Sequence, residues 1–278
     1  MRWRRLRLGA RRMGDSLKSL WHRRALILEL ARRDIEQRHR GSYLGPAWRL
    51  VYPLVQLAIY TFIFGVVFRV PWPSSANNGL ASKAILFYCG LAPVVFFTEC
   101  VGRAPSLITG SRNYVKRVVF PLEVLPLSAA IGSLLQLLIN MCVIVAGHIL
   151  SGGAVSWTLL LAPLVLVPLV LLALGISWLL ASVGVLVRDV SHGLVLLLQL
   201  VPLVTPVFYP IEVLPDGFRA LVKLNPLTAI VESFRRILLW QRPPDWLELG
   251  AWTIVGVLVV VTGLRLFNYT KQDFADVV

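Results

Sequence analysis

Six long apolar stretches, separated by short polar segments, dominate the pattern of the chain. They lie at residues 50–68, 84–101, 124–150, 157–187, 194–209 and 247–266. A helix rises about 1.5 Å per residue and the apolar core of a bilayer is about 30 Å thick, so roughly 20 residues are needed to cross it. Most of the stretches reach that length, although the fifth has only 16 residues. The pattern predicts an all-α polytopic membrane protein, with a six-span transmembrane domain over residues 50–278.

The fourth stretch is the longest, but its 31 residues are too few for two spans and a turn. It carries Pro163 and Pro168 near its start. Because proline removes a backbone donor and disrupts a helix interior, we expect the first turns of this span to be irregular or to lie in the interface.

The composition excludes a soluble globular domain, since 57% of the residues are hydrophobic and 15% are charged. Residues 1–49, every second loop after them and the C-terminal segment together hold 21 of the 28 Lys and Arg residues, and the alternate loops hold 7. The positive-inside rule therefore predicts that both termini are cytoplasmic. The net charge of +14 indicates the topology first and contact with membrane lipid headgroups second. It gives no reason to expect nucleic acid as a partner.

Cys89, Cys100 and Cys142 all lie inside apolar stretches. Their odd number and their setting argue against a disulfide framework and against a metal site. We expect them to be packing residues.

A basic arm at residues 1–20 precedes an amphipathic segment and a turn at residues 21–49. The apolar positions of the amphipathic segment recur at helical spacing. They are Trp21, Ala25, Leu28, Ala31 and Ile35. Charged residues occupy the other face, so the segment predicts a helix lying in the cytoplasmic interface. A solvated helix packed on a soluble domain is the alternative, but the chain has no such domain. Gly41 can end the helix, and Gly45-Pro46 predicts the turn into the first span.

Five motifs resemble, in order, those of the type 2 ABC permeases that export polysaccharides, the family of the Wzm O-antigen, KpsM capsule and TagG teichoic acid permeases. The first motif contains the interface-helix residues Arg33, Asp34, Arg38 and Arg40 and runs through Gly41-Ser42, Leu44-Gly45 and Trp48 to Pro53. The others are Tyr60-Thr61-Phe62-x-Phe64-Gly65-x-x-Phe68, Val118-x-Phe120-Pro121-x-Glu123-x-Leu125-Pro126, Pro206-x-Phe208-Tyr209-Pro210 and Asn225-Pro226-Leu227-Thr228. The likeness covers nearly the whole chain and is greatest to the Wzm group.

The resemblance implies a homodimer around a channel, with two copies of a separate ATP-binding subunit below it, in the bacterial inner membrane. The chain has no G-x-x-x-x-G-K-[ST] phosphate loop, so we expect it to be a permease subunit and not an enzyme. It should need no cofactor of its own, because ATP and Mg would be bound by the partner ATPase.

In such permeases the segment after the second span couples to the ATPase, and here it covers residues 102–123. Its residues 111–119 form a short amphipathic piece whose candidate coupling residues are Arg112, Asn113, Tyr114, Lys116 and Arg117. A basic loop that only anchors the topology would have the same pattern. Partner docking is the preferred interpretation, because Tyr114 and Val118 have no evident core to enter.

The first span carries a stripe of polar and aromatic residues at i+4 spacing: Tyr52, Gln56, Tyr60, Phe64 and Phe68. Aromatic faces can stack on the C–H faces of sugar rings, so the stripe is a candidate substrate channel. Packing against neighbouring helices or lipid is the alternative. In the third span, Gln136, Asn140 and His148 share a face, and we expect this face to make interhelical hydrogen bonds.

Residues 210–246 form a loop with apolar segments, which proline and glycine interrupt. The segment predicts two short helices that re-enter the outer face of the membrane, although a plain extracellular cap would have a similar pattern. By resemblance this is the external gate, and its candidate residues are Phe208, Tyr209, Asn225, Glu232, Arg235 and Arg236. Arg235 could face a sugar or a lipid phosphate.

The sequence thus predicts the permease of an ABC exporter that moves a lipid-linked polysaccharide to the periplasm. An exporter of a smaller lipid, a drug or teichoic acid is the alternative within transport. An intramembrane transferase is the alternative outside it, but no span or cytoplasmic loop gathers the paired carboxylates, or the histidine with a carboxylate, that such chemistry needs.

Overall fold

The computed structural model describes residues 20–37, 43–67, 80–111, 120–187, 189–271 and 274, except for the side chains of residues 64, 65, 80 and 81. All regular elements in these ranges are helices. They are α2 (Arg24–Gln37), η1 (Gly45–Ala47), α3 (Trp48–Tyr60), the π-helical η2 (Thr61–Val67), α4 (Leu80–Thr109), α6 (Val124–Leu150), η3 (Trp157–Leu161), α7 (Ala162–Leu186), α8 (Val190–Val204), η4 (Ile211–Val213), α9 (Asp216–Lys223), α10 (Pro226–Leu238) and α11 (Trp246–Thr270).

Within the described residues, a helix occupies each of the six apolar stretches, and four of these helices are long and apolar enough to cross a membrane. These four cover Ser82–Thr109, Val124–Leu150, Trp157–Leu186 and Trp246–Thr270. The chain is therefore a multi-pass membrane protein. The helix over 190–204 is apolar but shorter, as the brevity of the fifth stretch predicted. The fourth span begins with the 3₁₀ turn η3, which confirms the irregular start that its prolines predicted.

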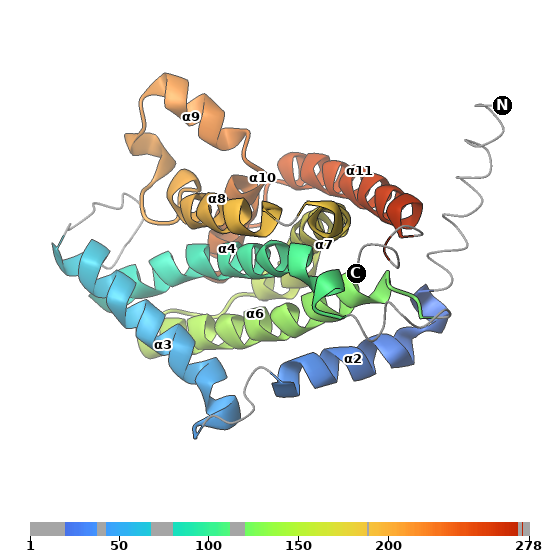
Figure 1. Ribbon diagram of the computed structural model, residues 1–278. Coiled ribbons are helices and arrows are strands. Elements are labelled where there is room, and N and C mark those ends of the chain that lie inside the picture. The colour runs from blue at the N-terminus through green and yellow to red at the C-terminus, as the bar shows by residue number, and fades with distance from the viewer. Residues whose placement is uncertain are drawn as a thin grey trace.

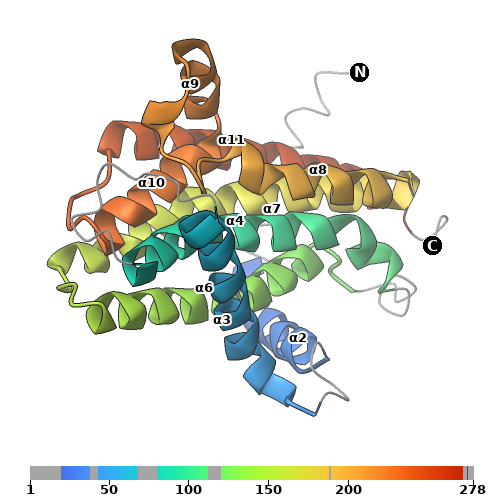
Figure 2. The same cartoon turned by 90° about the vertical axis from the view of Figure 1, so that its left-hand side faces the viewer.

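The helix α4 lies in the middle of the molecule and contacts α6, α7, α8 and α10 (Figure 1). The helix α7 packs on α4 on one side and on α11 on the other. Glycines allow these close approaches: a Cβ atom on Gly175 would lie 2.6 Å from the backbone carbon of Val259, and one on Gly184 would lie 2.5 Å from the Cα of Pro105. The four long helices run side by side, whereas α3 crosses them obliquely and exposes much of its surface (Figure 2).

The predicted second span is too short, because α4 continues to Thr109, through residues that the sequence assigned to the coupling loop. Ala104 and Ile108 are fully buried, so the extra turns pack against the bundle. Arg103 made these residues look like a loop, yet it is held in the structure by Asp34.

The interface helix forms as predicted but presents a different face to the bundle. Ile27, Leu30 and Ala31 are buried, and α2 packs on α6 through this side. Trp21 and Leu28 of the predicted apolar face remain exposed, whereas Ala31 of the same face is buried. The buried stripe is therefore rotated relative to the predicted one and shares Ala31 with it.

The loop between the fifth and sixth stretches contains the two predicted short helices. The helix α10 is almost entirely buried and contacts α4 and α7, while α9 projects from the bundle (Figures 1 and 2). Phe218, Leu221 and Leu224 of this projecting part are exposed. Whether these helices re-enter a membrane stays a prediction.

Candidate transport path and its two ends

An aromatic contact joins the end of the first predicted span to the segment that follows α8. Tyr60 is the last residue of α3, and its ring centroid lies 4.9 Å from that of Phe208. The ring of Phe208 also lies 6.3 Å from that of Phe87 in α4, and Phe208 is buried. The structure thus brings together one predicted channel residue, Tyr60, and one predicted gate residue, Phe208.

The segment that carries Phe208 is fastened to α10 by Arg235. The guanidinium Nη1 donates to the carbonyl of Pro206 and Nη2 donates to the carbonyl of Val207, both at 2.7 Å. Nη1 also donates to Glu232 Oε1 at 2.8 Å. Arg235 is fully buried, so in this conformation it faces backbone carbonyls and not a headgroup or a sugar.

Asn225 makes a second connection between the same segments. Its Nδ2 donates to Thr205 Oγ1 at 3.0 Å, and its Oδ1 accepts from the amide of Leu227 at 3.0 Å. The second bond is an N-cap of α10, which explains why Asn precedes Pro226 here. Tyr209 folds back, and its hydroxyl donates to the carbonyl of Leu203 at 3.1 Å. Residues 205–209 are thus tied to α10 and to the end of α8.

The remaining predicted channel and gate residues are placed as follows. Arg236 is half-buried on α10, and its carbonyl accepts from the amide of Arg242. Tyr52 is exposed and Gln56 is half-buried on α3. The side chain of Phe64 and the whole of Phe68 lie outside the described residues.

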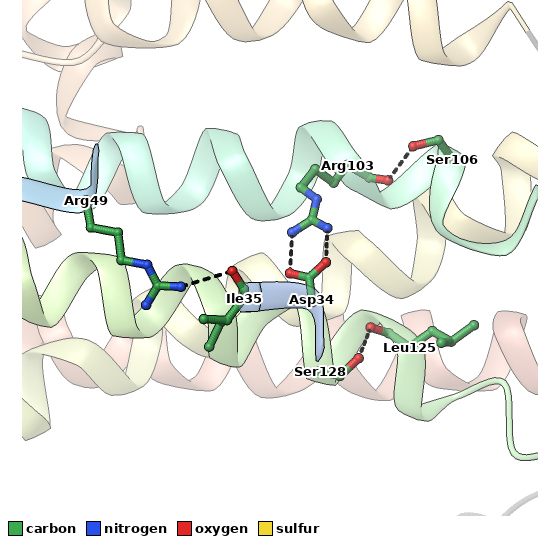
Figure 3. Close-up of polar contacts among 7 residues, drawn as sticks. All are labelled: Asp34, Ile35, Arg49, Arg103, Ser106, Leu125 and Ser128. Atoms are coloured by element: carbon green, nitrogen blue, oxygen red, sulfur yellow. Dashed lines mark hydrogen bonds and ion pairs between the residues drawn. The ribbon is translucent and has the colours of Figure 1, made fainter. Parts of the chain in front are cut away.

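At the other end of the bundle, α2 is held by polar contacts from α3 and α4 (Figure 3). Arg103 Nη1 donates to Asp34 Oδ2 at 2.9 Å, and Nη2 donates to Oδ1 of the same carboxylate. Arg49, at the start of α3, donates to the carbonyl of Ile35 at 3.2 Å. The pair of parallel bonds fixes both the position and the orientation of the carboxylate.

The polar face of the third span takes part in the same region. Gln136 Nε2 donates to the carbonyl of Arg49 at 2.8 Å and to Asn140 Oδ1 at 3.1 Å. The prediction that this face makes interhelical hydrogen bonds is thus confirmed for Gln136. Asp34, Arg49 and Gln136 link α2, α3, α4 and α6 around the turn at Gly45-Pro46.

Glu123 forms a second polar junction that the sequence reasoning missed. It is buried at the start of α6, and its carboxylate accepts from Lys271 Nζ at 3.1 Å and lies 3.8 Å from Arg23 Nη1. The indole of Trp178 donates to the Glu123 carbonyl at 3.1 Å. An acidic residue at the start of an apolar helix was the available signal, but its cationic partners are far away in the sequence.

The remaining predicted residues of this end are placed as follows. Arg33 pairs with Glu29 on the exposed side of α2, with Nε 3.0 Å from Oε1. Arg38, Arg40 and all five candidate coupling residues (Arg112, Asn113, Tyr114, Lys116 and Arg117) lie outside the described residues. Within the part of the chain that the structure describes, no group of three or more His, Cys, Asp and Glu residues could hold a metal ion.

A bundle of long apolar helices with polar junctions at both ends is the architecture of an integral membrane protein. Residues 25–239 match the model of the family described as ABC-2 type transporter, and the chain belongs to that family.

Known relatives cover nearly the whole chain. It is 28% identical over 262 residues to an O-antigen export system permease protein RfbA of Myxococcus xanthus, a match that spans 94% of this chain and 98% of the relative. An RfbA permease of Klebsiella pneumoniae is 26% identical, over 91% of this chain and 94% of its own length. The polysialic acid transport protein KpsM of Escherichia coli is 22% identical, over 87% and 91%.

Proposed function

We propose that the protein is the permease subunit of an ABC exporter that moves a lipid-linked polysaccharide, of the O-antigen type, across the bacterial inner membrane to the periplasm. The observation that carries the proposal is the near full-length similarity to permeases named for O-antigen export, joined by one named for polysialic acid transport. Because the alignments cover 87–94% of the chain, the similarity rests on far more than one motif.

The energy for transport comes from a partner in this proposal. The chain has no phosphate loop, so two copies of a separate ATP-binding subunit would hydrolyse ATP with its Mg. They would dock on residues 111–119. The permease itself would act as a homodimer that offers the ATPase pair one docking segment from each copy.

In the proposed topology, six spans place both termini in the cytoplasm, where the basic residues concentrate. The obliquely crossing α3 would be the first span and α8 the fifth. The helices α9 and α10 would re-enter the outer face as the external gate, and α2 would lie in the cytoplasmic interface with Trp21 and Leu28 toward the lipid.

The transport path would pass the aromatic contact between Tyr60 and Phe208. Aromatic rings offer stacking surfaces that tolerate many sugar linkages, which suits a polymer that moves past them unit by unit. The buried setting of Phe208 supports a path that is closed at this point in the present conformation.

Deletion of the gene in its native host tests the function. We expect loss of the surface polysaccharide, with accumulation of the lipid-linked glycan on the cytoplasmic side, and recovery of both on complementation. Unchanged surface polysaccharide, together with altered export of a smaller lipid, would contradict the proposal.

A further inference from the structure

A fully buried arginine holds an irregular segment of backbone at the outer end of the bundle. Arg235 has no exposed surface, and it donates to two successive carbonyls, those of Pro206 and Val207. Burying a guanidinium is strongly unfavourable unless its donors are satisfied. Breaking the bonds to the carbonyls would leave buried donors of Arg235 unsatisfied. These bonds therefore hold α10 and residues 205–209 together at this point.

A glycine in α4 makes room for this guanidinium. A Cβ atom on Gly90 would lie 2.6 Å from Arg235 Nη2 and 3.2 Å from its Cζ. A contact of 2.6 Å is shorter than carbon and nitrogen atoms allow, so the guanidinium can take its present place only because residue 90 has no side chain. Gly90 thus forms the socket in which Arg235 sits.

The segment held in this way carries Phe208. It follows Val207 directly, and its ring contacts those of Tyr60 and Phe87. A shift of the Val207 carbonyl would move Phe208 against these rings. The position of the aromatic contact therefore depends on a residue that does not touch it.

We propose that Arg235, seated on Gly90, is the positioning residue that makes residues 205–209 and α10 one rigid unit, and that this unit sets the closure of the path at the Tyr60–Phe208 contact. The inference rests on the proposed transport function and specifies how its outer end is held. It assigns to Arg235 an indirect role, in place of contact with the glycan or a headgroup.

Lysine cannot replace arginine in this role. A planar guanidinium presents donors in fixed, divergent directions and here reaches two carbonyls and the Glu232 carboxylate. An ammonium group is a compact point charge on a flexible stem and cannot reproduce that geometry. Arg235→Lys keeps the charge but should loosen the unit.

The first test measures passive leak of a small polar dye from proteoliposomes that contain the intact permease–ATPase complex. We expect Arg235→Lys and Gly90→Ala each to raise dye efflux several-fold per folded molecule. The double variant should leak no more than the leakier single one, because both changes break the same contact. Arg219→Lys and Gly250→Ala are matched controls, since Arg219 binds carbonyls in the projecting α9 region and a Cβ atom on Gly250 would meet nothing within 4 Å.

Wild-type efflux from both folded single variants, or effects that add in the double variant, would overturn the inference. Dye efflux needs no glycan, so it decides on the role of Arg235 even if the proposed substrate is wrong. A simple loss of stability would lower the amount of folded protein without raising efflux per molecule.

The second test keeps Arg235 intact and therefore does not depend on the folding of its variants. In a background without the native cysteines, a short bifunctional thiol reagent should stop glycan export when it bridges Tyr60→Cys and Phe208→Cys. A bridge between Thr205→Cys and Asn225→Cys lies within the unit, so it should not change export relative to the same double variant before bridging. Equal effects of the two bridges, each measured against its own variant before bridging, would refute the rigid unit, whereas absence of export by the unsubstituted complex would count against the proposed function instead.

Discussion

Asp34 of α2 and Arg103 of α4 form an ion pair through two hydrogen bonds, although 69 residues separate them in the chain. The side chain of Asp34 is 22% exposed and that of Arg103 is 33% exposed, so the pair is only partly shielded from water. It connects the interface helix to the end of the span that leads into residues 111–119. In the proposed topology, the pair would link the interface helix to the helix that precedes the candidate coupling segment.

Asp34→Asn removes the charge and should destabilise the permease by about 1–3 kcal/mol, because Arg103 is left half-buried without its carboxylate. The midpoint of thermal unfolding of the detergent-solubilised protein would report the loss. Glu29→Gln breaks the exposed i,i+4 pair with Arg33 and serves as the matched control, with an expected change below about 0.5 kcal/mol. Equal effects of the two substitutions would show that the Asp34–Arg103 pair contributes nothing beyond an ordinary surface pair.

Gly175→Ala should destabilise the packing of α7 on α11. Its Cβ atom would lie 2.6 Å from the backbone of both Val259 and Val260, which cannot rotate away as a side chain could. We expect a cost of about 1–3 kcal/mol, measured by the same thermal unfolding assay. Gly250→Ala on α11 has open space and should be neutral or stabilising by up to about 1 kcal/mol. If Gly175→Ala is as stable as the control, the close approach of these two helices is wrong.

The sequence could predict the positions of the six main helices because each must be apolar over most of its length. It could not predict the end of α4, since Arg103 resembles a loop residue until Asp34 is known to lie beside it. The buried face of α2 was only partly predicted for a similar reason: Ile27 and Leu28 are adjacent and equally apolar, and only the position of α6 decides which one is buried.

The candidate site was predictable in its parts but not in its connections. The motifs contain Tyr60, Phe208 and Asn225, Arg235 was a further predicted gate residue, and the structure places these residues in one region. That Arg235 is buried could not be predicted, because its partners are backbone carbonyls of Pro206 and Val207. Backbone carbonyls are present at every position and leave no signal in a sequence.

The proposed topology places Lys116 in the cytoplasm and Lys223 outside. Lys223 is exposed on α9, so a cysteine there should be accessible. In a background without native cysteines, Lys116→Cys and Lys223→Cys should react with an impermeant thiol reagent from opposite sides of the membrane. Reaction of both from the same side would refute the six-span arrangement.

Tyr60→Ala combined with Phe64→Ala should strongly reduce surface polysaccharide while the permease remains inserted and bound to its ATPase. Each lost aromatic contact is worth on the order of 0.5–1.5 kcal/mol, so one substitution should slow the passage of the glycan and two should slow it further. Complementation of the deletion strain, normalised to the amount of folded permease, gives the measurement. If the residual folded fraction exports normally per molecule, these rings only pack against their neighbours.

Reconstitution of ATP-driven glycan translocation tests the central claim most directly. Proteoliposomes would hold the purified permease, its partner ATPase and the lipid-linked polysaccharide of the native host, and the glycan that becomes accessible on the far side would be measured with and without ATP. We predict translocation with both subunits and ATP, and neither translocation nor ATP hydrolysis by the permease alone. ATP hydrolysis by the permease alone, or a complete complex that hydrolyses ATP but leaves the glycan in place, would contradict the account.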